Sequence, residues 1–133
     1  MDHHDQRVLI AEDDPNIRRM LTVSLRKQGY HTAEACDGSE ALAVMRAGQA
    51  DLVVLDLMMP KVTGWQVLAE RAADPKLRNI PVIVATAERG NAVTKILDDG
   101  NSALLPKPFS LEALQALVKV WSSGSPRREP QKG

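Results

Sequence analysis

The segment that most constrains the fold is the apolar run Leu52–Leu55, which lies between Asp51 and Asp56. A short run without polar alternation is typical of a strand buried on both faces, as in a parallel sheet covered by helices. Asp56 then stands at the carboxyl end of that strand, where ligands of open parallel sheets collect. We therefore take Asp56 as a candidate functional carboxylate. The alternative is that Asp56 only closes a turn. Asp51, at the other end of the run, is interpreted as a solvated strand start at the opposite edge of the sheet.

Four further segments have strand patterns, and helical patterns alternate with all five. The predicted strands are 7–11, 31–35, 52–55, 81–86 and 103–105. The pattern at 31–35 alternates polar and apolar residues and predicts an edge strand. The predicted helices begin at Asp14-Pro15, at Asp37, at Trp65, at Asn91 and after Ser110. Apolar spacing predicts that these helices bury Ile17, Met20, Leu21 and Leu25; Ala41, Leu42 and Met45; Trp65, Leu68 and Ala72; Val93, Ile96 and Leu97; and Leu111, Leu114, Leu117 or Val118, and Trp121.

This alternation predicts an α/β fold made of right-handed βαβ units. A short chain whose second strand is the more polar one fits a flavodoxin-like, doubly wound five-stranded parallel sheet with strand order 2-1-3-4-5 and five helices. That order makes the first and third strands neighbours. Glu12 and Asp13, which follow the first strand, are then expected beside Asp56.

Composition limits the class of protein. The 133 residues suit one domain, and the core is expected to be aliphatic because 44% of residues are hydrophobic and only 3% aromatic. Seventeen basic and 17 acidic residues leave no surplus for nucleic acid. The single Cys36 excludes an internal disulfide and is expected to pack as a small residue. No apolar segment is long enough to span a membrane or serve as a signal peptide, so we expect a soluble cytoplasmic protein.

The predicted rim of the sheet carries a set of groups suited to phosphoryl chemistry. Carboxylates that converge repel one another unless a cation neutralises them, and Mg²⁺ prefers such oxygen ligands. Thr86 and Lys107 end the fourth and fifth strands on the same rim and could contact the oxygens of a phosphoryl group. Aspartate can act as a nucleophile toward phosphorus, and Asp56 is placed for that role.

The motifs AEDDP, DLVVLDLMMPKVTG, PVIVATA and LPKPF, in this order, resemble the receiver domain of bacterial two-component response regulators. The resemblance covers residues 7–121 and leaves 1–6 as an N-terminal tail and 122–133 as a disordered C-terminal tail. It implies that Mg²⁺ binds Glu12, Asp13, Asp56 and the backbone carbonyl of Met58. It also implies that Asp56 accepts a phosphoryl group from a histidine kinase or phosphotransfer protein, that Thr86 and Lys107 contact it, and that Lys107-Pro108 is a cis peptide.

Three positions depart from the family pattern. Glu12 replaces an aspartate, Leu104 stands where receivers commonly carry an aromatic residue, and the segment between Thr86 and Lys107 is one residue shorter. None of these changes removes a group that phosphorylation needs. The resemblance implies a non-enzymatic switch, beyond self-phosphorylation and autodephosphorylation, whose protein-binding surface lies on the fourth helix, fifth strand and fifth helix.

A second hypothesis is a receiver-like interaction module whose binding does not depend on phosphate, and Leu104 motivates it. Two other α/β classes are excluded on chemical grounds. An FMN site needs a phosphate-binding loop after the first strand, where EDDP would repel phosphate. A haloacid-dehalogenase-like phosphatase needs a second aspartate where Met58 stands. The sequence leaves the kinase, the output partner, the oligomeric state and the completeness of the chain open.

Overall fold

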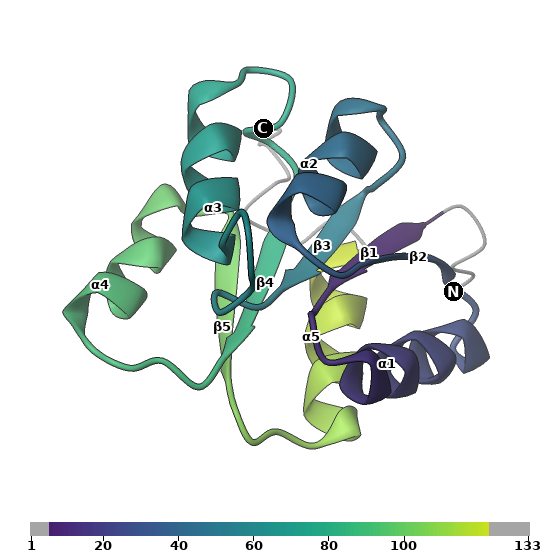
Figure 1. Ribbon diagram of the computed structural model, residues 1–133. Coiled ribbons are helices and arrows are strands. Elements are labelled where there is room, and N and C mark those ends of the chain that lie inside the picture. The colour runs from purple at the N-terminus through teal and green to yellow at the C-terminus, as the bar shows by residue number, and fades with distance from the viewer. Residues whose placement is uncertain (1–5, 123–133) are drawn as a thin grey trace, which may run out of the picture.

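The computed structural model describes residues 6–122, which form a five-stranded parallel sheet with helices on both faces (Figure 1). The strand order is β2-β1-β3-β4-β5, which confirms the predicted fold class and the edge position of the second strand. The elements in chain order are β1 Arg7–Ala11, α1 Pro15–Lys27, β2 His31–Ala35, α2 Gly38–Arg46, β3 Leu52–Leu55, α3 Gly64–Ala73, β4 Val82–Thr86, α4 Asn91–Thr94, the 3-10 helix η1 Lys95–Asp99, β5 Ser102–Pro106 and α5 Leu111–Ser122.

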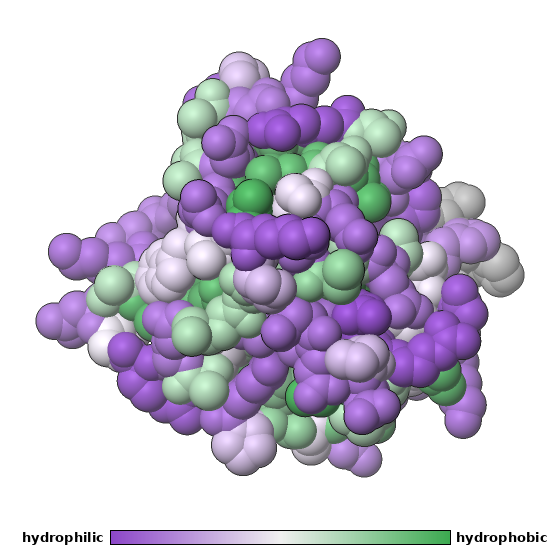
Figure 2. Space-filling view, viewed as in Figure 1, coloured by the Kyte–Doolittle hydropathy of each residue, from purple (hydrophilic) through white to green (hydrophobic). Residues whose placement is uncertain are grey.

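Alternate residues of the inner strands build two aliphatic cores, one on each face of the sheet. On one face Leu9 and Val53 pack beneath α2, α3 and α4. On the other face Ile10 and Val54 pack beneath α1 and α5 (Figure 1). β3 is buried along its whole length, as its continuous apolar sequence predicts. The outer surface is mostly hydrophilic in the view of Figure 2, with small apolar patches between charged side chains.

The strand register brings the four predicted rim segments together. Ala11 pairs with Leu55, and Leu55 pairs with Val84. Thr86 pairs with Pro106 in the next strand along. Since all strands run in the same direction, the residues that follow these pairs emerge at one edge of the sheet.

Two predicted helix faces are partly wrong. In α1, Leu21 and Leu25 are buried, but Met20 is 50% exposed because the buried face is shifted toward Thr22 and Ser24. In α3, the buried residues are Val67 and Arg71, with Gly64 at the start of the helix. Of the predicted inward positions, Trp65 and Leu68 are half-buried and do pack against the core, whereas Ala72 is exposed.

The fourth helical segment spans the predicted 91–99 but is not one α-helix. Its first turn has no side-chain cap at Gly90, and from Lys95 it tightens into η1, which ends at Gly100 with φ 72°. Val93 is buried and Ile96 is packed at the edge of the core, whereas Leu97 is exposed, contrary to the predicted stripe.

The two ends of the described chain bear on the other predictions. α5 buries Leu114, Val118 and Trp121, and it extends to Ser122, one residue past the predicted end of the domain. Residues 1–5 and 123–133 lie outside the described part, so the tails stay predictions. Asp51 forms an ion pair with Arg7 rather than being simply solvated. No helix within residues 6–122 is long and apolar enough to cross a membrane.

Candidate functional site

The ammonium of Lys107 lies between two buried carboxylates at the carboxyl edge of the sheet. Its Nζ donates to Glu12 Oε1 at 2.9 Å and to Asp56 Oδ2 at 3.0 Å. The carboxylate side chains are 5% and 7% exposed, while the lysine side chain reaches in from the edge and is 22% exposed. Lys107 is 95 residues from Glu12 and 51 residues from Asp56 in sequence, so distant segments meet at one point, as the predicted strand order requires.

Asp13 joins this cluster from the solvent side. One carboxylate oxygen from each of Glu12, Asp13 and Asp56 lies within 4.8 Å of the others. Glu12 Oε2 also accepts from the amide of Asp14, and Asp56 Oδ1 accepts from the amide of Met58. These backbone amides fix both carboxylates, so the oxygen set is held in place and fits a hard cation such as Mg²⁺.

Burial and charge act in opposite directions on the two partners of the Glu12–Lys107 pair. Burial raises the pKa of Glu12 above its usual range, and the hydrogen bond from Lys107 only partly opposes this effect. Burial alone would lower the pKa of Lys107, but hydrogen bonds to Glu12 and Asp56 raise it above its usual value. Lys107 is therefore charged, and it supplies the positive charge that the two carboxylates require.

Thr86 ends β4 next to this cluster and is almost fully buried. Its Oγ1 accepts a hydrogen bond of 3.2 Å from the amide of Glu88, and its carbonyl accepts from the amide of Lys107 at 2.9 Å. Lys107-Pro108 is a cis peptide, which confirms that expectation.

The loop after Asp56 turns sharply around the site. Met58 is largely exposed, and Lys61 adopts a left-handed conformation with φ 62°. The amide of Gly64 returns to bond the carbonyl of Leu57, and a side chain at Gly64 would collide with the backbone of Asp56 and Leu57. The glycine is therefore required by close approach of the loop to the site.

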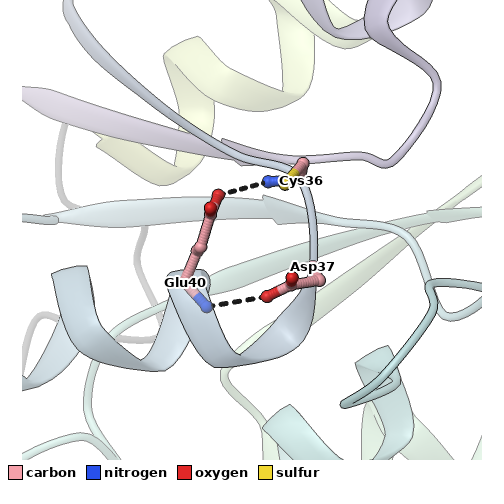
Figure 3. A group of neighbouring side chains, drawn as sticks. All are labelled: Cys36, Asp37 and Glu40. Carbon is pink, nitrogen blue, oxygen red and sulfur yellow. Dashed lines mark hydrogen bonds between the residues drawn. The ribbon is translucent and has the colours of Figure 1, made fainter.

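A second group of residues that could bind a metal lies at the start of α2 and comprises Cys36, Asp37 and Glu40 (Figure 3). Asp37 Oδ1 accepts from the amide of Glu40, and Glu40 Oε1 accepts from the amide of Cys36. The first bond satisfies a free N–H group of the first helical turn, and the second ties Glu40 back to the residue before the N-cap. The Glu40 carboxylate beside the Cys36 thiol raises the pKa of that thiol, which disfavours the nucleophilic thiolate.

The sequence did not identify three side chains that join distant segments: Glu88 and Arg89 beside the site, and Arg71 at the opposite edge of the sheet. Arg71 is a buried arginine on α3, and its only sequence signal is that it stands four residues after Val67 on the same helix face. Glu88 and Arg89 follow Thr86 in the loop between β4 and α4. Glu88 accepts from the indole of Trp65, and Arg89 donates to the carbonyl of Lys107 at 3.0 Å. Contacts between loops leave no periodic pattern in sequence.

Leu104, at the position where the resembled family commonly has an aromatic residue, is half-buried on β5. It lines an apolar cavity of about 130 Å³ together with Thr86, Val93 and the loop that contains Glu88. The cavity therefore borders both Thr86 at the end of β4 and the residues of α4.

Comparison with known proteins identifies the family. The profile of the response regulator receiver domain matches residues 8–119. The chain is 38% identical over 121 residues, 90% of its length, to the DNA-binding response regulator MtrA of Mycolicibacterium smegmatis, and 38% identical over 116 residues, 86% of its length, to the transcriptional regulator RpaA of Synechocystis. It spans about half the length of these relatives, 52% and 48% respectively.

Solved receiver structures agree in fold. The receiver domain of a Francisella response regulator superposes with a TM-score of 0.81 at 30% identity, covering 90% of this chain and 98% of that one. The response regulator TrrA of Thermotoga maritima, solved in complex with Mg²⁺ and beryllofluoride, gives a TM-score of 0.75 at 31% identity over 87% and 98% of the two chains. The chain belongs to the receiver-domain family of two-component response regulators.

Proposed function

We propose that this receiver, over residues 7–121, accepts a phosphoryl group on Asp56 and thereby switches a protein-binding surface. The observation that carries the proposal is the position of Lys107 Nζ, shared between Glu12 and Asp56 at the carboxyl edge of the sheet. Asp56 is a carboxylate held between a backbone amide and an ammonium, with Thr86 close by in the adjacent strand. This arrangement suits a nucleophile whose product carries added negative charge.

Mg²⁺ would be held by Glu12, Asp13, Asp56 and the carbonyl of Met58. Their fit rests on an all-oxygen donor set whose three carboxylates are gathered by the fold. When bound, Mg²⁺ would neutralise charge on the phosphoryl oxygens. The TrrA complex with Mg²⁺ and beryllofluoride supports this assignment by analogy.

In the proposed transfer, an Asp56 carboxylate oxygen forms a bond to phosphorus while the bond from phosphorus to the donor's histidine nitrogen breaks. The bonding electrons stay on that nitrogen, which takes up a proton. Lys107 then holds an oxygen of the transferred group, and the hydroxyl of Thr86 donates to another. The donor is a histidine kinase or a phosphotransfer protein, and we place this exchange in the cytoplasm.

The proposed output surface comprises α4, β5 and α5, which contact a protein partner still to be identified. Phosphate shifts this surface only if the phosphoryl group contacts one conformation better than another. MtrA and RpaA are described as DNA-binding and transcriptional regulators. We assign no nucleic-acid contact to the receiver itself, because its charges balance.

The proposal is tested by phosphoryl uptake from acetyl phosphate. Wild-type protein should incorporate phosphate only with Mg²⁺ present, and Asp56→Asn should incorporate none. Asp99→Asn, which removes a carboxylate far from the cluster, is the matched control and should incorporate phosphate normally. Uptake that survives in Asp56→Asn would contradict the proposal.

The cavity beside Leu104 favours a second candidate function, an interaction module that binds its partner without phosphate. Partner affinity unchanged by beryllofluoride and Mg²⁺ would support this alternative. An affinity change of tenfold or more, equivalent to about 1.4 kcal/mol, would support the phosphorylation switch.

A further inference from the structure

We propose that Trp65 is a positioning residue for Thr86, acting through Glu88, and that it holds the threonine in its resting orientation. The inference rests on the proposed function of Asp56. Trp65 Nε1 donates to Glu88 Oε1 at 3.3 Å, and the amide of Glu88 donates to Thr86 Oγ1 at 3.2 Å. These two bonds link the first turn of α3 to the hydroxyl at the end of β4.

The bond from Glu88 defines where Thr86 points. A phosphoryl group on Asp56 offers oxygens that need donors, and Thr86 lies in the strand next to Asp56. Turning the hydroxyl toward that group carries Oγ1 away from the amide of Glu88. The bond between Thr86 and Glu88 therefore belongs to the unphosphorylated arrangement.

Glu88 is restrained because its side chain is anchored. Trp65, in α3, is half-buried and packs against the core. Its indole N–H donates to the carboxylate of Glu88 and so anchors the loop to α3. Arg89, the next residue, bonds the carbonyls of Ala87 and Lys107. The loop after Thr86 is thus held by Glu88 on the side of α3 and by Arg89 on the side of β5. The contact with α3 depends on one hydrogen-bond donor, the indole N–H of Trp65, which a single substitution removes.

The region beneath the loop permits movement. The apolar cavity of about 130 Å³ is lined by Thr86, Val93 and Leu104 and by the loop segment 88–90. A packed interior resists displacement, whereas a cavity allows side chains to move at small cost. Because this cavity borders Thr86, we take the hydrogen bonds of the loop, rather than close packing, as the restraint on the threonine.

The relay has an outer end on the protein surface. Trp65 lines a groove between α3 and the α4–η1 segment with Leu68, Ala92 and Ile96. Release of Glu88 from the indole on phosphorylation would alter the environment of Trp65 at this groove. Tryptophan fluorescence can therefore follow the relay directly.

The test compares the binding of beryllofluoride with Mg²⁺ in Trp65→Phe, Glu88→Ala and the double variant. Because a hydrogen bond contributes modestly, each single change should tighten binding by about two- to tenfold. The double variant should gain nothing beyond either single change, as expected for one shared interaction. Glu88→Gln keeps an acceptor oxygen and should restore wild-type affinity.

Trp121→Phe supplies both a control and a single-tryptophan background. This variant should bind beryllofluoride like the wild type, and Trp65 emission should change on binding. Unchanged or weaker binding in both Trp65→Phe and Glu88→Ala would overturn the inference, as would constant Trp65 emission. Failure of wild-type protein to bind beryllofluoride would instead overturn the proposed function.

Discussion

At the residue scale, the charge of Lys107 accounts for the coexistence of two buried carboxylates. Glu12 and Asp56 are both almost fully buried, and each contacts the same ammonium. Burial of an unpaired carboxylate is strongly unfavourable, so the lysine stabilises the site in the absence of metal. The positive charge of Lys107 also opposes the binding of Mg²⁺ at the same carboxylates.

Replacement of Lys107 by methionine should separate these two effects. Without Mg²⁺, the free energy of unfolding should fall by about 1–3 kcal/mol, because the carboxylates lose their charged partner. Mg²⁺ should bind about tenfold more tightly, because a positive charge near the ion is removed. Urea unfolding and Mg²⁺ titration measure both quantities. Lys61→Met removes an exposed lysine and should change neither, and an unaltered Mg²⁺ affinity in Lys107→Met would contradict the account.

Gly64 is constrained by space rather than by its backbone angles. A Cβ there would collide with the carbonyl of Asp56, so Gly64→Ala should destabilise the protein by about 1–3 kcal/mol and weaken Mg²⁺ binding. Gly48 is the matched control, because it has φ 72° but open space around it. Gly48→Ala should cost about 1 kcal/mol and leave Mg²⁺ affinity unchanged. Equal Mg²⁺ affinity in both variants would exclude the steric explanation.

At the element scale, Arg71 joins α3 to the segments that precede β4 and β5. Its guanidinium donates to the carbonyl of Ile80, to Asp99 and to the carbonyl of Asn101. Asp99 also accepts from the hydroxyl of Ser102. The buried arginine therefore fixes the end of η1, the segment that leads into the proposed output surface.

Arg71→Met should lower the free energy of unfolding by about 1–3 kcal/mol, since two carbonyls and a carboxylate lose their donor. The exposed Arg46–Glu70 pair provides the comparison, and Arg46→Met should cost less than about 1 kcal/mol. Urea unfolding of both variants measures the difference. An equal loss of unfolding free energy in the two variants would contradict this account, because the buried Arg71 would then contribute no more than an exposed ion pair.

The pH dependence of this network follows from Asp99. Burial would raise the pKa of its carboxyl, but hydrogen bonds from Asn101, Arg71 and Ser102 hold that pKa below its usual value. The stabilisation is therefore complete above the unfolded pKa of about 3.9 and disappears as the pH falls through the lower folded value.

Asp99→Asn should therefore be less stable than wild type at neutral pH by about 1 kcal/mol or less, because the side chain is partly exposed. The difference should shrink below about pH 4. Urea unfolding across the acid range measures it. A difference that is constant down to the lowest pH would contradict the assignment.

At the scale of the whole molecule, pattern and register explain why the fold and the site could be predicted. The apolar run Leu52–Leu55 identifies a buried strand, and the order 2-1-3-4-5 then brings Glu12, Asp56 and Lys107 together. Each of these residues follows a strand end, so its position depends only on topology.

Features that depend on side-chain packing could not be predicted in the same way. Met20 fits the apolar spacing of α1 yet faces solvent, and Arg71 is charged yet buried because three acceptors from other segments meet it. The bond between Trp65 and Glu88 joins helix α3 to the loop after β4, and no local pattern predicts that these segments meet. The apolar spacing of residues 91–99 likewise did not predict that the α-helix gives way to the 3-10 helix η1 at Lys95.

The central claim is that Asp56 is the phosphoacceptor, and locating the phosphoryl group tests it most directly. After incubation with acetyl phosphate and Mg²⁺, peptide mapping by mass spectrometry should place one phosphoryl group on the peptide that contains Asp56. Omission of Mg²⁺ or the change Asp56→Asn should abolish it. A phosphoryl group on any other residue, or none under these conditions, would contradict the account.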